Sequence, residues 1–439
     1  MRTLLKNGRI LDPSQGLDIV GNLLIEDDQI VAFGKEVEKV EVDEVYDCTD
    51  MWICPGLVDP HVHLREPGGE DKETIVTGTQ AAAAGGYTTI CCMPNTDPPL
   101  DSPALIDFIL DRAASPESGG VFVAPVGALT RGMRGEELAD LAAMKRAGIV
   151  AASDEQFPIQ NAYVMTQAME FCVQLDLPIM AHCEDTNLTK GGSMNEGAMS
   201  AMLGLKGIPR SAEEIAVVRN CLLSLHTGCQ LHIMRVSTWG AVEMIRQAKF
   251  LGAPVTCEIC PMHFAFIEDH VGEFDTRFKI QPPLRTQVDI DLLVQALADG
   301  TIDCIASDHS PHASHEVDVP FEEAPFGSAQ LESAVGVTLT LLTHKGILTP
   351  LETINKLSTK PAEILRLDAG TLKPGGTPVA QICVIDPNCQ WTFDRHKTFS
   401  KSKNTPFDGM RMTGKAMLTF SGSEIYRDAL FPEDRYSSS

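Results

Sequence analysis

The sequence predicts an α/β fold, a (β/α)8 barrel of the TIM type with a small β domain formed by both chain termini. Three observations predict it. Short apolar runs alternate with helix-like stretches from residue 56 onward. Eight such runs can be counted, which is the strand number of a closed parallel barrel. Segments with strand-like alternation flank these runs at both ends of the chain; the N-terminal one is too short to bury a good core alone, and the C-terminal one has no partner nearby in the sequence.

The bulk composition is ordinary for a globular protein and excludes two classes of partner. The chain has 439 residues, of which 44% are hydrophobic and 22% are charged. Its 60 acidic and 35 basic residues give a formal charge of −25, which argues against nucleic acid or an anionic membrane as a partner. No apolar run approaches the ~20 residues of a transmembrane helix, and the N-terminus lacks the apolar core of a signal peptide. The 13 cysteines therefore indicate reduced thiols and a cytoplasmic location.

The two terminal segments share one kind of pattern. Residues 1–55 alternate apolar and polar positions, and Asp27 and Asp28 predict a hairpin turn between two short strands. The same alternation returns after residue 365. We therefore predict that residues 1–55 and 366–439 form one small β domain beside a barrel of residues 56–365.

The elements of the barrel are predicted from the period of the apolar residues. Short continuous apolar runs indicate buried strands, and longer stretches with a helical period indicate the connecting helices. The predicted strands are Leu57–His63, Tyr87–Cys92, Val121–Gly127, Ile149–Ser153, Pro178–His182, Gln230–Val236, Pro254–Ile259 and Ile302–Ser307. The predicted helices include Asp71–Ala84, Ala162–Leu175, Ala212–Leu225 and Trp239–Phe250.

Polar side chains gather where the predicted strands end. His61 and His63 close the first strand, and residues two apart on a strand point to the same face, so they can form half of a metal site. One buried histidine is more often structural than a ligand. A collection at the C-terminal rim of a barrel is harder to explain structurally, because clustered polar groups cost free energy unless they bind something. The other polar residues near strand ends are Arg65, Asn95, Asp154, His182, Glu258, His263, Asp308, His309 and His312.

Seven short blocks of sequence form a specific set. They are VDPHVHLREPG at 58–68, MPNTDPP at 93–99, SDE at 153–155, MAHCED at 180–185, KIQPPLR at 279–285, DGTIDCIASDHSPH at 299–312 and SKSKNTPFDG at 400–409. Together they resemble the bacterial type I dihydroorotases of the amidohydrolase superfamily. HxH and DHSPH mark the superfamily, whereas HLREPG, MPNT and SKSKNTPF point to dihydroorotase.

The resemblance implies a zinc-dependent cyclic amidohydrolase that interconverts N-carbamoyl-L-aspartate and (S)-dihydroorotate in de novo pyrimidine (UMP) biosynthesis. It implies that His61, His63 and Asp308 hold one zinc. It also implies that Asp154 bridges to a second zinc, which His182 binds. Asp308 further matches the catalytic general acid and base. The implied substrate-binding residues are His63, Arg65, Asn95, Gln281, His312, Phe326 and Gly327.

Three positions depart from the pattern of these dihydroorotases. Arg235 stands where they have a histidine that binds the second zinc, and a guanidinium is a poor zinc ligand. We therefore expect one Zn²⁺, with the second weak or absent. Gln281 replaces an asparagine and is one methylene longer, so the pocket must shift. Met262 replaces a histidine, a change that the sequence does not explain.

The sequence leaves three functions open. The first is an active dihydroorotase with one zinc. The second is a non-catalytic dihydroorotase-like subunit of an aspartate carbamoyltransferase complex, which Arg235 motivates because such a chain would begin by losing a metal ligand. The third is another cyclic amidase, an allantoinase or hydantoinase, which Arg65 and Asn95 disfavour because they match a carboxylated substrate. We expect a small-molecule substrate, a homo-oligomer, and aspartate carbamoyltransferase as the candidate protein partner.

Overall fold

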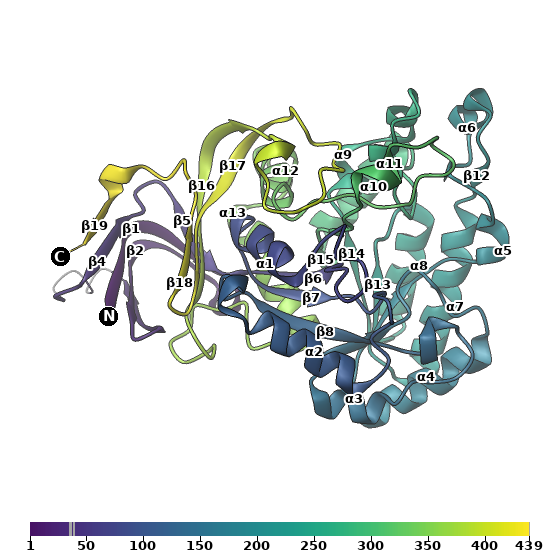
Figure 1. Cartoon of the computed structure of the whole chain (residues 1–439), viewed down its shortest axis with the longest axis horizontal. Helices are drawn as coiled ribbons and strands as arrows, with labels where there is room; N and C mark the ends of the chain where they lie inside the picture. The colour runs from purple at the N-terminus through teal and green to yellow at the C-terminus, as the bar shows by residue number, and fades with distance from the viewer. Residues whose placement is uncertain (35–36, 38–39, 439) are drawn as a thin grey trace.

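The computed structural model describes residues 1–34, 37 and 40–438, and it consists of a barrel with a β-sheet part at one end (Figure 1). The predicted fold class is confirmed. An eight-stranded sheet forms the barrel, and its neighbouring strands are parallel. Its strands, in chain order, are β6 (Leu57–Val62), β7 (Tyr87–Cys92), β8 (Phe122–Ala128), β9 (Ala151–Ser153), β10 (Ile179–His182), β13 (Leu231–Met234), β14 (Val255–Ile259) and β15 (Cys304–Ile305).

The barrel closes between its first strand and the chain that follows its last strand. Val62 and His309 form a parallel bridge, and the amide of His63 donates a hydrogen bond to the carbonyl of His309 at 2.9 Å. The amide of Ser307 donates to the carboxylate of Asp59 beneath this bridge, at 3.2 Å. The closure brings the two histidine-rich blocks, residues 58–68 and 299–312, side by side.

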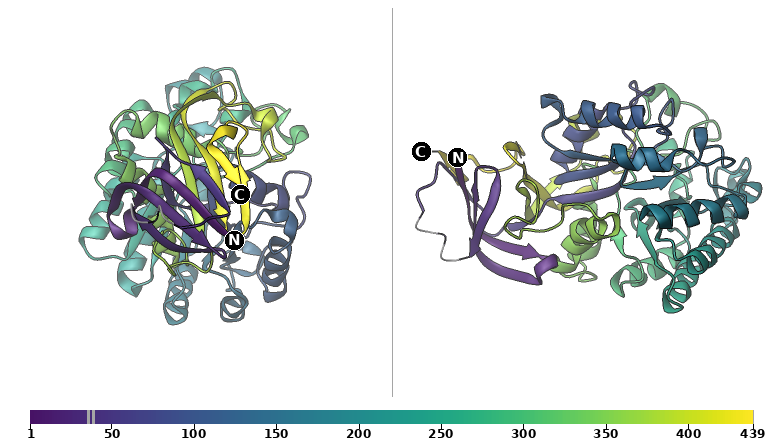
Figure 2. Two further views of the ribbon diagram at one scale, coloured as in Figure 1. Left: turned by 90° about the vertical axis from the view of Figure 1, so that its left-hand side faces the viewer. Right: turned by 90° about the horizontal axis from the view of Figure 1, so that it is seen from below.

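Helices cover the outside of the barrel (Figures 1 and 2). Capping residues define where they begin: the side chain of Thr74 accepts from the amide of Thr77 before α1, and that of Asn161 accepts from Tyr163 before α4. The observed α4 and α8 match their predicted ranges. The helices are α1 (Ile75–Ala84), α2 (Pro103–Ala113), α3 (Leu141–Ala147), α4 (Ala162–Leu175), α5 (Thr186–Thr189), α6 (Ala198–Leu203), α7 (Ser211–Thr227), α8 (Trp239–Phe250), α9 (Met262–Ala265), α10 (Gln287–Ala298), α11 (Ser314–Val317), α12 (Ala334–Thr338), α13 (Pro350–Ile354) and α14 (Lys360–Leu365).

Strands from both ends of the chain share one nine-stranded sheet, and the two termini lie close together at its far edge (Figure 2). The strand β5 joins the two ends, because it pairs with β1 on one side and β16 on the other. A two-residue turn with positive φ at Asp27 and Asp28 links β2 to β3, as predicted. The strands are β1 (Arg2–Asp12), β2 (Leu17–Glu26), β3 (Gln29–Gly34), β4 (Glu44–Asp47), β5 (Trp52–Pro55), β16 (Gln381–Thr392), β17 (Arg411–Ser421), β18 (Glu424–Arg427) and β19 (Tyr436–Ser438).

This sheet has its own apolar core, which includes Leu5, Leu23, Ile382 and Phe420. The domain boundaries at residues 55 and 365 stay a prediction, and Ser439 lies outside the described residues. Two short strands, β11 (Met194–Asn195) and β12 (Gly207–Ile208), pair in a loop after β10. All 13 cysteines carry free thiols. Within the part of the chain that the structure describes, no helix is both long enough and apolar enough to cross a membrane.

Candidate active site

The polar residues predicted to gather at one rim do so at the C-terminal ends of the barrel strands. Four polar residues at this rim have a left-handed backbone, two of them predicted (Arg65 with φ 61° and Asp308 with φ 53°) and two not (Glu155 with φ 41° and Arg235 with φ 54°). Such a conformation costs a residue with a side chain about 1–3 kcal/mol. Because backbone strain of this kind gathers at functional sites, its recurrence at the ends of four strands indicates that this rim is a functional site.

His61, His63 and Glu155 form a buried cluster that could hold a metal ion, which we call the histidine–glutamate cluster. Nε2 of His61 lies 3.2 Å from Oε1 of Glu155, and Nε2 of His63 lies 3.7 Å from the same oxygen. One donor atom from each of the three residues falls within 4.8 Å of the others. Two imidazole nitrogens and a carboxylate oxygen are a donor set typical of a catalytic zinc site.

Neighbouring side chains fix the direction of both histidine rings. Nδ1 of His61 lies 2.7 Å from Glu258, and Nδ1 of His63 lies 2.7 Å from Oδ1 of Asn95. A ring that donates from Nδ1 turns Nε2 toward Glu155, where Nε2 can bind a metal ion once it carries no proton. Nε2 of His63 and Oε2 of Glu155 are buried and have no hydrogen-bond partner among the described residues. These unsatisfied atoms fit a metal ion, because buried polar atoms rarely go without a partner.

The electrostatics of the cluster favour positive charge. Burial opposes protonation of His61, yet the carboxylates of Glu258 and Glu155 raise its pKa to about 10. Burial instead lowers the pKa of His63 well below its usual value, which keeps that ring in the neutral form that binds metal. The position between these carboxylates therefore attracts a cation.

The guanidinium of Arg235 lies against this cluster. Its side chain is 5% exposed, with Nη2 2.7 Å from Oε1 of Glu155 and Nη1 3.2 Å from Oδ1 of Asp308. Burial opposes the charge, but these two carboxylates outweigh it and raise the pKa of Arg235. Burial alone would raise the pKa of Glu155, and Arg235 is the main cause that holds it well below its usual value. Arg235 thus places a fixed positive charge beside the candidate metal position.

A second group of residues of the types that bind metals, His232, Glu258 and Cys304, is also buried. Nδ1 of His232 lies 2.9 Å from the hydroxyl of Thr256, and Nε2 lies 3.0 Å from Glu258. Burial raises the pKa of the Cys304 thiol well above its usual value, which disfavours the thiolate that would bind a metal. Both nitrogens of His232 are engaged, so this group is satisfied without a metal.

Comparison with known proteins agrees with this geometry. A family model described as dihydro-orotase-like matches residues 51–240. A dihydroorotase of Pelotomaculum thermopropionicum is 46% identical over 425 residues, which cover 97% of this chain and 98% of that protein. A dihydroorotase of Geobacter metallireducens is 44% identical and covers 97% of this chain and 99% of its own. The chain belongs to the dihydroorotase family. The predictions of this family and of a hydrolase enzyme are confirmed.

Solved structures with the same fold come from neighbouring hydrolases. The L-hydantoinase of Arthrobacter aurescens aligns with a TM-score of 0.86 at 24% identity, covering 97% of this chain and 96% of that one. The dihydropyrimidinase of Brevibacillus agri NCHU1002 aligns with a TM-score of 0.84 at 23% identity, covering 98% and 96%. At this identity the likeness shows the fold alone.

Asp154, predicted as the bridging carboxylate of this dihydroorotase-family chain, does not face the histidines. Its Oδ1 accepts from the amide of Thr130 at 2.8 Å, and its Oδ2 accepts from the Thr130 hydroxyl. Burial raises the pKa of Asp154 to about 6. The chain has a φ of 41° at Glu155, and the side chains of Asp154 and Glu155 point in different directions, to Thr130 and to the two histidines. Glu155 therefore replaces Asp154 in the candidate metal site.

His182, predicted as a ligand of the second metal, also lies outside the cluster. Its Nε2 lies 3.0 Å from Oε2 of Glu184, and this oxygen also accepts from the side chain of Gln281, while Oε1 of Glu184 accepts from the Thr189 hydroxyl. Burial would raise the pKa of Glu184, but its bonds to His182 and the other two side chains lower it to about 2. The structure thus engages His182 and Gln281 with one carboxylate that the sequence reading had not singled out.

Asp308 lies between the histidine–glutamate cluster and Arg235. Its Oδ1 is 3.6 Å from Nε2 of His61, within reach of an ion that both would hold. Burial raises the pKa of Asp308, although Arg235 opposes this shift. A buried carboxyl group with a raised pKa is suited to accept and return a proton.

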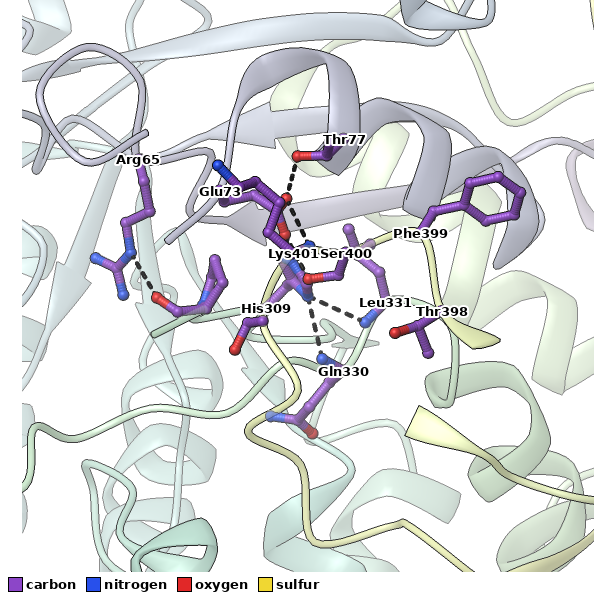
Figure 3. A network of polar contacts seen from close by, with 12 residues as sticks. Arg65, Glu73, Thr77, His309, Gln330, Leu331, Thr398, Phe399, Ser400 and Lys401 are labelled. Atoms are coloured by element: carbon purple, nitrogen blue, oxygen red, sulfur yellow. Dashed lines mark hydrogen bonds and ion pairs between the residues drawn. The ribbon is translucent and has the colours of Figure 1, made fainter. Parts of the chain in front are cut away.

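The backbone next to Asp308 is anchored by a buried network that joins three parts of the chain (Figure 3). Nε2 of His309 lies 3.2 Å from Glu73, and Nδ1 of His309 accepts from the amide of Gln330 at 3.1 Å. Glu73 also accepts from the hydroxyl of Ser400 and from the amide of Lys401. The network ties the SKSKNTPF block to the end of the last barrel strand, so it holds Asp308 in place.

The remaining predicted substrate-binding residues line the same rim. Nε of Arg65 donates to the carbonyl of Pro311 at 3.1 Å (Figure 3). Nε2 of His312 lies 2.9 Å from the carbonyl of Phe326, and burial is the main cause that lowers the pKa of His312 to about 4. Gly327 has a φ of 142°, and a Cβ there would lie 2.8 Å from Nε2 of His312, so only glycine fits. Their contacts with substrate stay a prediction.

Sequence reasoning missed Glu155, Glu184 and Glu73 as parts of the site. The Asp-Glu pair at 154–155 was a usable signal for Glu155, because two adjacent carboxylates at a strand end face different directions unless the backbone compensates. The positive φ that points Glu155 inward has no sequence signature, since glutamate is not a residue that favours this region. Glu184 and Glu73 are recognised as parts of the site only by their contacts in the folded structure.

Proposed function

We propose that this chain is a zinc-dependent dihydroorotase that interconverts N-carbamoyl-L-aspartate and (S)-dihydroorotate in de novo pyrimidine biosynthesis. The observation that carries the proposal is the histidine–glutamate cluster, whose free nitrogen and oxygen converge in a member of the dihydroorotase family. The neighbouring residues also suit a carboxylated substrate, since Arg65 and Asn95 stand at the same rim.

His61, His63 and Glu155 would hold the metal, with Asp308 on the side of Arg235. When bound, zinc lowers the pKa of water at its open position to about 7 and polarises a carbonyl group. We propose a single metal ion, because the guanidinium of Arg235 lies between Glu155 and Asp308 and repels a second cation.

The protein side chains would then orient the substrate and move one proton. Asp308 would take the proton of the attacking water and return it to the ring nitrogen as the amide bond breaks. Arg65, Asn95 and His312 would bind the carboxylate that the ring retains. Nδ2 of Asn95 supports this role, because it is buried and has no acceptor among the described residues.

The test is cyclisation of N-carbamoyl-L-aspartate by purified, zinc-loaded protein. We expect turnover that falls by about 10²–10⁴-fold in Asp308→Ala, the usual effect of losing a general acid or base. Wild-type turnover no faster than that of Asp308→Ala would overturn the proposal. Faster turnover of allantoin or hydantoin than of dihydroorotate would assign the site to another cyclic amidase.

A second candidate is a non-catalytic subunit of an aspartate carbamoyltransferase complex. Arg235 favours it, because a guanidinium in a metal site is one way for such a chain to lose activity. Zinc content and activity of the isolated chain decide between the two. A chain that holds one zinc and is active alone rejects the structural role, whereas a zinc-free chain that co-purifies with the transferase supports it. For the active enzyme we further propose a cytoplasmic homo-oligomer.

A further inference from the structure

Two hydrogen-bond donors of Arg235 have no acceptor among the described residues. Nη1 donates to Asp308, while Nη2 faces Glu155 without the alignment of a hydrogen bond. Nε and Nη2 are buried, and neither has a hydrogen-bond acceptor among the described residues. Leaving a charged donor buried and unbonded is costly, so such donors point to a ligand that supplies the missing acceptor.

A second buried arginine shows that the unbonded donors are not a general consequence of burial. Nε of Arg285 donates to the hydroxyl of Ser237 at 3.1 Å. Nη1 of Arg285 donates to Asn195 at 2.7 Å and to the carbonyl of Ile208 at 3.0 Å. The chain therefore satisfies an arginine that serves its structure and leaves Arg235 unsatisfied at the rim.

Arg235 and Arg65 belong to one charged site. The carboxylates of Glu155 and Asp308 act on the pKa of both arginines, so both guanidinium groups lie near the same pair of acids. In Arg65 only Nε has a hydrogen-bond acceptor within the described residues. The rim thus carries two arginines that each have donors without an acceptor among the described residues. Such a pair matches a ligand with two anionic groups.

We propose that Arg235 binds the carboxylate that reacts, while Arg65 holds the carboxylate that is retained. This inference rests on the proposed function. N-carbamoyl-L-aspartate carries two carboxylates. On cyclisation the carbamoyl nitrogen attacks the carbon of one of them, and a C–N bond forms as the nitrogen loses a proton. One carboxylate oxygen then leaves as water, taking that proton and one more from the medium.

The proposal gives Arg235 a specific duty in recognition. The reacting group is an anion in N-carbamoyl-L-aspartate and a neutral carbonyl in the ring product. A fixed guanidinium at this position therefore favours the open, dianionic form, and it also meets the charge that develops on the oxygen during ring closure. Arg235 is then a specificity-determining residue of this site.

Two inert probes isolate this interaction. N-acetyl-L-aspartate has both carboxylates but no carbamoyl nitrogen to close a ring, and N-acetyl-L-asparagine replaces one carboxylate by a neutral amide. Their dissociation constants are measured by calorimetry on zinc-loaded, full-length wild type, Arg235→Gln, Arg235→Lys and Arg285→Gln. The zinc content of each protein is measured alongside, so that affinities are compared at equal metal occupancy.

We expect wild type to prefer the aspartate probe. Arg235→Gln should lower this preference about 10-fold or more, the usual weight of a hydrogen bond to a charged group. Arg235→Lys should keep part of this preference, because lysine keeps the positive charge but lacks the planar pair of guanidinium donors. Arg285→Gln should keep the preference even where it lowers the thermal midpoint.

Three results would overturn the inference. In the first, Arg235→Gln keeps the wild-type preference. In the second, Arg285→Gln loses the preference as fully as Arg235→Gln does, which would make the effect one of general damage. In the third, wild type binds neither probe. The proposed function is judged separately by cyclisation of N-carbamoyl-L-aspartate, so an active enzyme with an unchanged preference in Arg235→Gln would reject only this inference.

Discussion

Two groups of metal-type side chains lie inside one barrel, and they differ in what their atoms already bind. His232, Glu258 and Cys304 are as deeply buried as His61, His63 and Glu155. Both nitrogens of His232 have partners, at 2.9 and 3.0 Å, whereas Nε2 of His63 and Oε2 of Glu155 have none among the described residues. Residue type and burial therefore do not mark a metal site by themselves. The two groups are distinguished by ligand atoms that lie within 4.8 Å of one another and still have no hydrogen-bond partner among the described residues.

Removing a ligand from the histidine–glutamate cluster should have the largest effect. His63→Ala leaves one imidazole and one carboxylate, which cannot hold zinc tightly. We expect zinc to fall from about one per chain to nearly none, and turnover to fall by about 10³-fold or more. Mass spectrometry of the metal and the cyclisation assay measure both. The matched control is Cys304→Ala in the other group, which should keep its zinc. If Cys304→Ala lost its zinc and His63→Ala kept it, the metal would instead be assigned to the group of His232, Glu258 and Cys304.

Changing the satisfied group should reduce stability instead of metal content. His232→Ala leaves a cavity and takes a partner from Glu258 and from Thr256. We expect the free energy of unfolding to fall by about 3 kcal/mol, as measured by urea denaturation. Zinc should remain at about one per chain. A loss of zinc as complete as in His63→Ala would instead make His232 a ligand.

Glu258 connects the two groups, so it should have an intermediate effect. Its carboxylate holds Nδ1 of His61 at 2.7 Å and Nε2 of His232 at 3.0 Å. Glu258→Gln keeps the shape but weakens the orientation of the ligand His61. Loss of such a supporting group typically weakens metal binding by about 10–100-fold. Competition with a chelator measures the change, and an unchanged zinc affinity would show that His61 needs no such support.

A histidine outside both groups tests the effect of burial alone. Burial lowers the pKa of His263 to about 4, although Nε2 lies 3.0 Å from the carbonyl of Pro282. The unfolded chain takes up a proton below pH 6.5 and the folded chain resists it, so stability is present above pH 6.5 and is lost toward pH 4. We expect His263→Gln to lose about 2 kcal/mol less than wild type between pH 7.5 and pH 5. If urea denaturation showed the same loss of unfolding free energy in wild type and His263→Gln, the lowered pKa of His263 would be contradicted.

The sequence was sufficient for the parts that depend on periodicity and local spacing. All eight barrel strands were predicted near their observed ranges, and α4 and α8 matched to the residue. The spacing of His61 and His63 predicted that both rings face one way, and Nε2 of each does approach the same oxygen of Glu155. This holds although His63 lies one residue beyond β6 and the pairing of β6 with β7 is irregular between Asp59 and Val62.

Three features of the site are not predicted from the sequence. Asp154 was chosen over Glu155, and a φ of 41° at Glu155 decides between them. His182 has Nε2 held by Glu184, a contact that the sequence does not predict, while its Nδ1 is buried without a partner among the described residues, so its role as a metal ligand stays a prediction. Asn95 is predicted to bind substrate, and its amide oxygen also lies 2.7 Å from Nδ1 of His63, an orienting contact that the sequence does not predict. Each of these depends on a contact between residues in space, which spacing along the chain does not encode.

We propose that one metal ion and the guanidinium of Arg235 share this site. The most direct test is the zinc content of purified wild-type protein beside that of Arg235→His. We predict about one zinc per chain in wild type, and about two in the variant, because removing the guanidinium frees Glu155 and supplies a new nitrogen ligand. Two zinc ions in wild type, or no gain in a folded Arg235→His protein, would contradict the account.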